Sequence, residues 1–147
     1  MKAVILYVSV HHGNTRKVVE TMAEVLSANL IDLTKQKDAD LSGYDLIGLA
    51  SGAYYQSMHK RIRQFAADVQ FQPNQKVFLV CTCSTVFRDY TKGIRKILET
   101  KQVEVLKSFQ CLGINTYGPF ALIGGIAKGR PNEKDLERAR EYARELL

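Results

Sequence analysis

The sequence predicts an α/β fold built on an open, doubly wound parallel sheet of about five strands. Continuous apolar runs rich in Val, Ile and Leu recur along the chain, as in strands that are covered on both faces. Segments with a helical spacing of apolar residues lie between these runs. The two patterns alternate without a repeat or a break in composition, so one domain spanning residues 1–147 is expected.

Five segments are predicted to be strands. The three strongest are the short, continuously apolar runs at residues 3–10, 46–50 and 77–80. Residues 29–33 and 109–115 are shorter candidates. The first run is too short to span a membrane, and no small-residue cleavage site follows it, so it indicates a buried strand rather than a signal peptide.

Four segments are predicted to be helices: residues 15–26, 57–69, 88–105 and a last one that opens at Pro131 and Asn132. Asn132 is a good N-cap, and Glu133 and Asp135 complement the helix dipole in the first turn. The polar crossover at residues 34–43 is short, so it is expected to hold no more than a turn or two of helix.

Composition is typical of soluble globular proteins, with 46% apolar and 24% charged residues. No segment approaches the length of a membrane span, so a cytoplasmic protein without membrane contact is expected. The net charge of +6 comes from 21 basic and 15 acidic residues, and the basic ones are scattered. The one local cluster, at residues 59–63, is interpreted as a solvated helix face, so no nucleic-acid partner is expected.

The three cysteines are predicted to be reduced, buried thiols. Cys81 and Cys83 are two positions apart in an apolar run, which places them on one side of a strand, and Cys111 lies far along the chain. Histidine and cysteine never occur at zinc-finger spacing, so no metal site is expected.

Ligands of open parallel sheets bind beyond the carboxyl ends of the strands, where the strand order reverses. Residues 9–15 follow the first predicted strand and lead straight into a helix. Gly13 permits a tight turn, and the free amides of the first helical turn form an anion site, to which Ser9, Asn14 and Thr15 add polar groups. No lysine follows the glycine, which excludes the nucleotide-triphosphate loop. A plain turn with a polar cap explains the same residues equally well.

Two further strand ends carry residues suited to a planar ligand. After the third strand come two small residues, Ser51 and Gly52, and the tyrosines Tyr54 and Tyr55, which suit an aromatic face. Residues 82–87 after the next long strand are again small and polar, with one aromatic side chain. Loop tyrosines alone more often serve packing, but the combination of all three strand ends is more specific than any one of them.

These segments resemble the flavodoxin family. Residues 9–15 are similar to its phosphate loop, residues 44–54 to its third strand and first flavin loop, and residues 82–87 match the position of its second flavin loop. The resemblance extends to about Thr116. It implies a five-stranded sheet of order 2-1-3-4-5 that holds FMN, with the phosphate at residues 9–15 and the isoalloxazine ring between the two later loops.

The resemblance also implies which residues bind the cofactor. In the phosphate loop they are Ser9, His11, His12, Gly13, Asn14 and Thr15. In the first flavin loop they are Ser51, Gly52, Ala53, Tyr54 and Tyr55. In the second flavin loop they are Thr82, Cys83, Ser84, Thr85 and Phe87. Tyr54 or Tyr55 is expected to stack on the ring. No residue pair is spaced for acid–base catalysis, so no catalytic residue is expected.

Three features depart from the family pattern. His11 and His12 stand where flavodoxins usually carry hydroxyl residues, so the phosphate gains a partly cationic donor or, equally, two neutral ones. The chain is basic, whereas electron-carrier flavodoxins are typically acidic, and a basic host is expected to raise the reduction potential of bound FMN. The apolar, Gly-rich segment 117–130 is interpreted as a packed excursion or an oligomer contact, in preference to a lid.

The predicted function is electron transfer through FMN, to a redox partner protein or a small-molecule acceptor. One alternative is an FMN-dependent oxidoreductase of the quinone reductase type, which needs room for substrate beside the ring. Another is a flavodoxin-fold binding module without a cofactor. Receiver domains share the sheet but need paired acidic residues after the first strand, where this chain has His11 and His12. Both a monomer and a homodimer remain compatible with the sequence.

Overall fold

The computed structural model describes residues 1–147 except 11, 55, 86, 115–124 and 126. In the described part, a parallel sheet has the order β2-β1-β3-β5-β6, and the short strands β4 and β7 pair with β3 and β5. The strands are β1 (Ala3–Val8), β2 (Asn29–Asp32), β3 (Leu46–Tyr54), β4 (Ser57–Met58), β5 (Lys76–Cys83), β6 (Glu104–Val105) and β7 (Phe109–Leu112). The predicted fold class and order are confirmed, with the fifth strand divided into β6 and β7.

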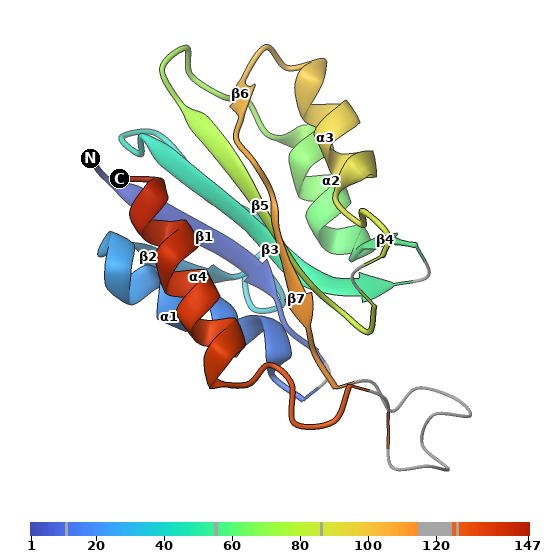
Figure 1. Cartoon of the computed structure of the whole chain (residues 1–147). Helices are drawn as coiled ribbons and strands as arrows, with labels where there is room; N and C mark the ends of the chain where they lie inside the picture. Colours follow the sequence, from blue (N-terminus) through green and yellow to red (C-terminus); the bar gives the residue numbers. More distant parts are fainter. Residues whose placement is uncertain (11, 55, 86, 115–124, 126) are drawn as a thin grey trace.

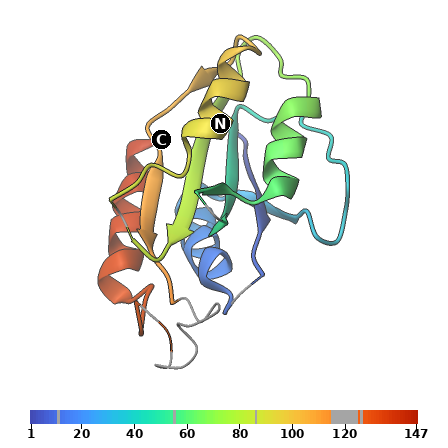
Figure 2. The same ribbon diagram turned by 90° about the vertical axis from the view of Figure 1, so that its right-hand side faces the viewer.

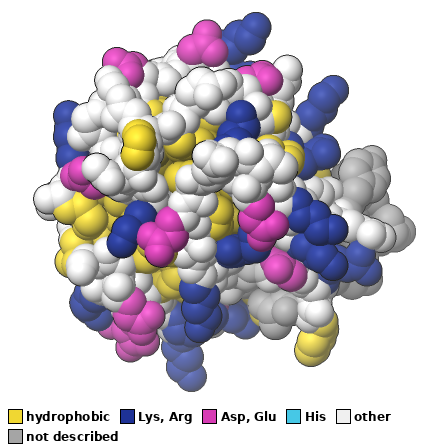
Figure 3. All heavy atoms as spheres, turned by 90° about the horizontal axis from the view of Figure 1, so that it is seen from above, with side chains coloured by type: hydrophobic (Ala, Val, Ile, Leu, Met, Phe, Trp, Pro, Cys, Tyr) yellow, Lys and Arg dark blue, Asp and Glu magenta, His cyan; other side chains and the backbone are white. Residues whose placement is uncertain are grey.

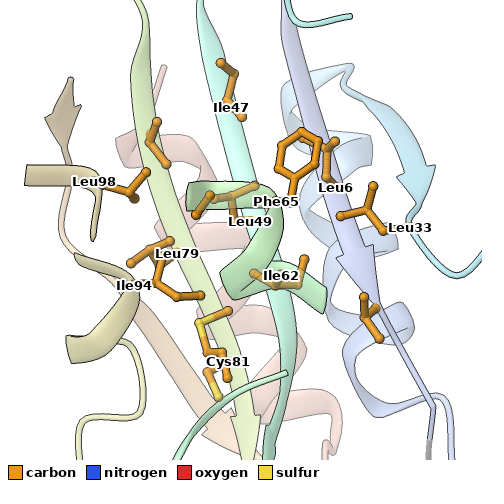
Figure 4. Packing of buried hydrophobic residues seen from close by; sticks show 14 of the residues in the cluster. Leu6, Leu33, Ile47, Leu49, Ile62, Phe65, Leu79, Cys81, Ile94 and Leu98 are labelled. Atoms are coloured by element: carbon orange, nitrogen blue, oxygen red, sulfur yellow. The ribbon is translucent and has the colours of Figure 1, made fainter. Parts of the chain in front are cut away.

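Helices cover both faces of this sheet (Figures 1 and 2). Helices α1 (Asn14–Leu26) and α4 (Glu133–Glu145) pack on one face, and α2 (Lys60–Asp68) and α3 (Lys92–Glu99) on the other. Successive residues of a strand point to opposite faces, so Leu79 and Cys81 join the core under α2 and α3, whereas Val80 joins the core under α1. Figure 4 shows the first of these two cores.

Several predicted boundaries were wrong, because pairing between strands overrides local pattern. Strand β3 runs on to Tyr54, since it pairs in antiparallel fashion with β4, and this pairing delays the start of α2 to Lys60. Helix α3 stops at Glu99 instead of continuing to residue 105, because Glu104 and Val105 pair with the first residues of β5. The first strand ends at Val8, not at Val10.

Other local predictions are confirmed. Asn132 caps α4: its side chain accepts a hydrogen bond from the Asp135 amide, while the Asp135 carboxylate accepts one from the Asn132 amide. The three cysteines are free and buried. Residues 34–43 form turns without a helix. Among the described helices, none combines the length and the apolar character that crossing a membrane requires.

Candidate functional site

The strand order reverses between β1 and β3, and this point defines the site. From β1 the chain first adds β2 on one side, and it then returns to place β3 on the other side. The carboxyl ends of β1, β3 and β5 lie side by side, with Val8 opposite Ser51 and Ser51 opposite Cys81. The loops that follow these three strands therefore meet at one edge of the sheet, which we call the carboxyl edge (Figure 1).

The turn between β1 and α1 begins the helix without a side-chain cap. His12 and Gly13 both have a positive φ, of 58° and 65°, and an added Cβ on Gly13 would meet nothing within 4 Å. Ser9 Oγ accepts a hydrogen bond from the Arg16 amide at 3.1 Å, but the N-cap residue, Gly13, has no side chain to offer the earlier amides. Consecutive left-handed residues at a helix N-terminus form a concave donor set that suits an anion. His11 lies outside the described residues.

A buried hydrogen bond joins this turn to the end of β5. Thr15 Oγ1 lies 2.8 Å from Thr82 Oγ1, and both residues are buried. Next to it, the Asn14 side chain is 8% exposed, and its Nδ2 donates to the carbonyl of Ile114 at 3.0 Å. Asn14 Oδ1 is buried and has no hydrogen-bond partner in the described part of the chain. A buried amide oxygen of this kind is costly unless a donor reaches it.

The predicted first flavin loop is a tight hairpin rather than a loop after a strand. Ser51, Gly52, Ala53 and Tyr54 all belong to β3, and Tyr54 pairs with Ser57 of β4. Ser51 is fully buried, and its Oγ accepts a hydrogen bond from the His59 amide at 2.9 Å. The hairpin is thereby tied back to the sheet. Tyr55, the next residue in the sequence, lies outside the described residues.

His59 supports both Tyr54 and helix α2. The rings of His59 and Tyr54 meet edge to face, with their centres 4.8 Å apart, and His59 Nδ1 accepts a hydrogen bond from the Arg61 amide at 2.9 Å. Burial raises the pKa of Tyr54. Burial, together with the cationic Arg63 and Arg61, lowers the pKa of His59. His59 is therefore a neutral N-cap at pH 7, since a protonated Nδ1 could not accept the amide hydrogen bond.

Acidification should weaken the protein through His59. Because its folded pKa lies below the unfolded value of about 6.5, the unfolded state binds more protons, and stability falls as the pH drops below about 6.5. Loss of an N-cap costs up to about 1 kcal/mol. Urea unfolding at pH 7.5 and 5 measures this loss. The His59→Asn variant keeps a cap acceptor that does not titrate, so it should lose less stability than the wild type, and an equal loss would contradict this role.

The end of β5 presents one exposed aromatic side chain. Thr82 and Cys83 are the last residues of β5 and are buried, whereas Ser84 and Thr85 are half-buried. Phe87 is 98% exposed, and its amide donates to Thr85 Oγ1 at 3.3 Å. A phenyl ring in water is available to cover a planar ligand.

The Cys83 thiol belongs to the core rather than to the carboxyl edge. Its Sγ lies 3.5 Å from the carbonyl of Cys111, and burial raises its pKa to about 11. Cys81 and Cys111 also have raised pKa values because of burial. All three side chains are therefore neutral thiols near pH 7, and none has the thiolate character of a nucleophile.

Sequence reasoning missed the contacts that hold the edge together. The sequence predicts that His59 belongs to a solvated basic cluster, but its amide and ring contact Ser51 and Tyr54 of the hairpin. Arg61, in the same cluster, donates to the carbonyls of Leu33 and Lys37 and so fixes the segment after β2 against α2. The segment 117–130, interpreted as a packed excursion or an oligomer contact, lies mostly outside the described residues. Among the described residues, no group of three or more His, Cys, Asp or Glu is arranged to hold a metal ion.

Comparison with known proteins identifies the family. A model of the flavodoxin domain matches residues 4–118, which is most of the chain. The chain belongs to the flavodoxin domain family. A relative with 40% identity, covering 100% of this flavodoxin domain protein and 99% of its own length, is an uncharacterized protein of Methanocaldococcus jannaschii.

Solved flavodoxin structures share the fold. Flavodoxin 2 of Bacillus cereus superposes with a TM-score of 0.72 at 15% identity, over 97% of this chain and 95% of its own. A flavodoxin from the domain Archaea gives 0.68 at 15% identity, over 99% and 96%. A WrbA-like flavodoxin of Agrobacterium tumefaciens gives 0.64 at 14% identity, over 97% and 93%. At these identities the likeness concerns the fold alone.

Proposed function

We propose that this protein binds FMN at the carboxyl edge and uses it to carry electrons. One observation carries the proposal. The carboxyl ends of β1, β3 and β5 lie side by side at the point where the strand order reverses, and each is followed by a different kind of loop. The Thr15–Thr82 hydrogen bond holds two of them together, and the Ser51–His59 hydrogen bond holds the third against the sheet. Family membership supports a flavin in particular.

The residues present fit the parts of FMN. The start of α1 has open space over Gly13 and no side-chain cap, and the N-terminus of a helix suits a phosphate. Tyr54, supported by His59, and the exposed Phe87 suit the two sides of the isoalloxazine ring. The orphaned Asn14 Oδ1 is an acceptor that a hydroxyl or N–H group of the cofactor could satisfy. Tyr55 and His11, which belong to the proposed contact set, lie outside the described residues.

The remaining residues proposed to contact FMN would do so through backbone and small polar groups. FMN supplies one- and two-electron transfer when it is bound. The protein's part is to anchor the phosphate, cover the ring and keep water from it. Gly52 and Ala53 precede Tyr54 in β3, and with little or no side chain they would contact the cofactor through their backbone. Ser84 and Thr85 offer hydroxyl and amide groups at its edge, where Cys83 contributes backbone only because its thiol is buried.

A redox titration of the FMN-loaded protein tests the carrier role. Reduction adds negative charge to the cofactor, so the net charge of +6 should raise the midpoint potential above that of acidic flavodoxins. An equal or lower potential would contradict this expectation. Mixing the FMN-loaded protein with a reduced nicotinamide cofactor distinguishes a carrier from an enzyme. Rapid oxidation of that cofactor would indicate an FMN-dependent oxidoreductase.

A further inference from the structure

Charge is segregated between the two ends of the sheet. We define the carboxyl rim as the described residues that follow the strands, up to the first turn of the next helix where one follows, namely 9, 10, 12–17, 33–38, 56–63, 84, 85, 87–92 and 127–136. The rim holds twelve Lys or Arg and four Asp or Glu, a net charge of +8. The rest of the chain holds nine Lys or Arg and eleven Asp or Glu, a net charge of −2. The residues that the structure does not describe include no Lys, Arg, Asp or Glu. The whole excess of positive charge therefore lies at the proposed flavin edge.

The opposite end of the molecule shows the contrast. Figure 3 looks onto the amino ends of the strands, where Asp and Glu side chains stand among Lys and Arg. Outside the rim, Glu137 of α4 pairs with both Arg140 and Arg144. At the rim, the exposed Lys60, Arg63, Arg88 and Lys92 form no ion pair within the described part of the chain. Their charge faces solvent unneutralised.

The phosphate of FMN does not account for this charge. The proposed phosphate loop, residues 9–15, precedes α1 on one face of the sheet. Lys60 and Arg63 lie in the first turn of α2. Lys92 is the first residue of α3, and Arg88 lies in the loop before it. Both helices cover the other face of the sheet. A phosphate monoester adds about two negative charges, which leaves the rim strongly positive. The rim therefore keeps a positive surface that can attract a second anionic group.

Apolar groups stand among these cations. Phe87, 98% exposed, directly precedes Arg88, and Val10, 53% exposed, follows Ser9 in the phosphate loop. These are two of the five large apolar side chains that are exposed in the described residues. Protein–protein interfaces commonly combine an apolar or aromatic centre with a charged border. The border steers the approach of a partner with the opposite charge.

We propose that the carboxyl rim docks an acidic electron-transfer protein, with Lys60, Arg63, Arg88 and Lys92 meeting carboxylates around an apolar contact at Phe87. This inference rests on the proposed function, since the partner must bring its own redox centre to the flavin edge. One electron leaves the flavin as the metal centre of the partner gains it, or passes in the opposite direction. Nucleic acid and anionic membranes share the charge but carry no such centre.

The test compares two double variants with the same change in net charge. Lys60→Glu/Arg88→Glu reverses charge at the rim, whereas Lys96→Glu/Lys107→Glu does so in the last turn of α3 and before β7. The probes are an acidic plant-type [2Fe–2S] ferredoxin as electron donor and basic cytochrome c as electron acceptor. Stopped-flow rate constants are measured between about 10 and 300 mM ionic strength, across which charge steering is lost. Binding of oxidised ferredoxin is measured in parallel, with and without FMN.

The wild type should react with ferredoxin about tenfold or more faster at low than at high salt, and rim reversal should remove that dependence. The Lys96→Glu/Lys107→Glu variant should behave like the wild type. Equal effects of both variants would show that only net charge matters, and that result would overturn the proposal. A rim that binds anionic vesicles or duplex DNA but not ferredoxin would overturn it as well. A wild type that binds ferredoxin without retaining FMN would keep the docking surface and contradict the proposed function instead.

Discussion

The Gly13→Asp substitution should weaken FMN binding strongly while leaving the fold intact. Asp tolerates the left-handed backbone better than most residues, and the space over Gly13 is open. A carboxylate at a helix N-terminus also interacts favourably with the helix dipole. At about 5 Å from a phosphate dianion, however, it costs about 2–3 kcal/mol at dielectric constants of about 40–80, which corresponds to a loss of about 30- to 150-fold in affinity.

The matched control for this substitution is Gly13→Asn, which has the same shape and backbone preference without the charge. Its dissociation constant for FMN, measured by quenching of flavin fluorescence, should stay within a few-fold of the wild-type value. Riboflavin lacks the phosphate, so Gly13→Asp should bind it as well as Gly13→Asn does. If both variants lose FMN equally, or if riboflavin binding is lost too, the phosphate does not lie at the turn before α1.

Removing the carboxylate of Asp135 should cause the largest loss of stability. Asp135 is 1% exposed, and it accepts hydrogen bonds from Arg130 Nε at 2.5 Å, Arg130 Nη2 at 2.6 Å and the Asn132 amide at 2.8 Å. The Asp135→Ala substitution leaves these donors without their acceptor. A buried pair broken on one side costs about 3–5 kcal/mol, and the lower end is expected because Arg130 is 31% exposed and can regain water.

Two measurements check that Asp135 stabilises the protein as a buried, ionised carboxylate: the effect of removing an exposed ion pair, and the dependence of stability on pH. Glu137→Ala removes exposed pairs to Arg140 and Arg144 and should change the free energy of unfolding much less than Asp135→Ala does. The Arg130 guanidinium lowers the pKa of Asp135, so its stabilisation is present above the unfolded pKa of about 3.9 and is lost as the pH falls through the lower folded value. The stability difference between wild type and Asp135→Asn should hold from pH 7 to 5 and shrink below pH 4. A constant difference down to pH 2 would contradict the ionised pair.

The strands were predictable where burial alone decides the structure. The apolar runs that begin at Ala3, Leu46 and Val77 are covered on both faces, so their composition identifies them. Their ends depend on which partner strand reaches them. Neither the extension of β3 to Tyr54 nor the diversion of residues 104–105 from helix to strand follows from local periodicity, because both depend on pairs between distant segments.

The loops that form the candidate site were predictable from the sequence, but the hydrogen bonds that join them were not. Gly13 and its polar neighbours predict a turn at the start of a helix, and the structure places Gly13 as the N-cap of α1. The Thr15–Thr82 and Asn14–Ile114 hydrogen bonds span 67 and 100 positions, and no local pattern encodes them. His59 illustrates the same limit. Its place among cations predicts a solvated side chain, but folding turns the ring onto Tyr54.

FMN retention is the most direct test of the central claim. The purified protein is mixed with FMN and desalted, and its visible absorbance and flavin fluorescence are then recorded. About one retained flavin per chain with quenched fluorescence is expected, because we propose that Tyr54 and Phe87 contact the ring. A colourless, folded protein that releases all of its FMN would leave the flavodoxin fold standing but contradict cofactor binding, and with it the proposed electron transfer.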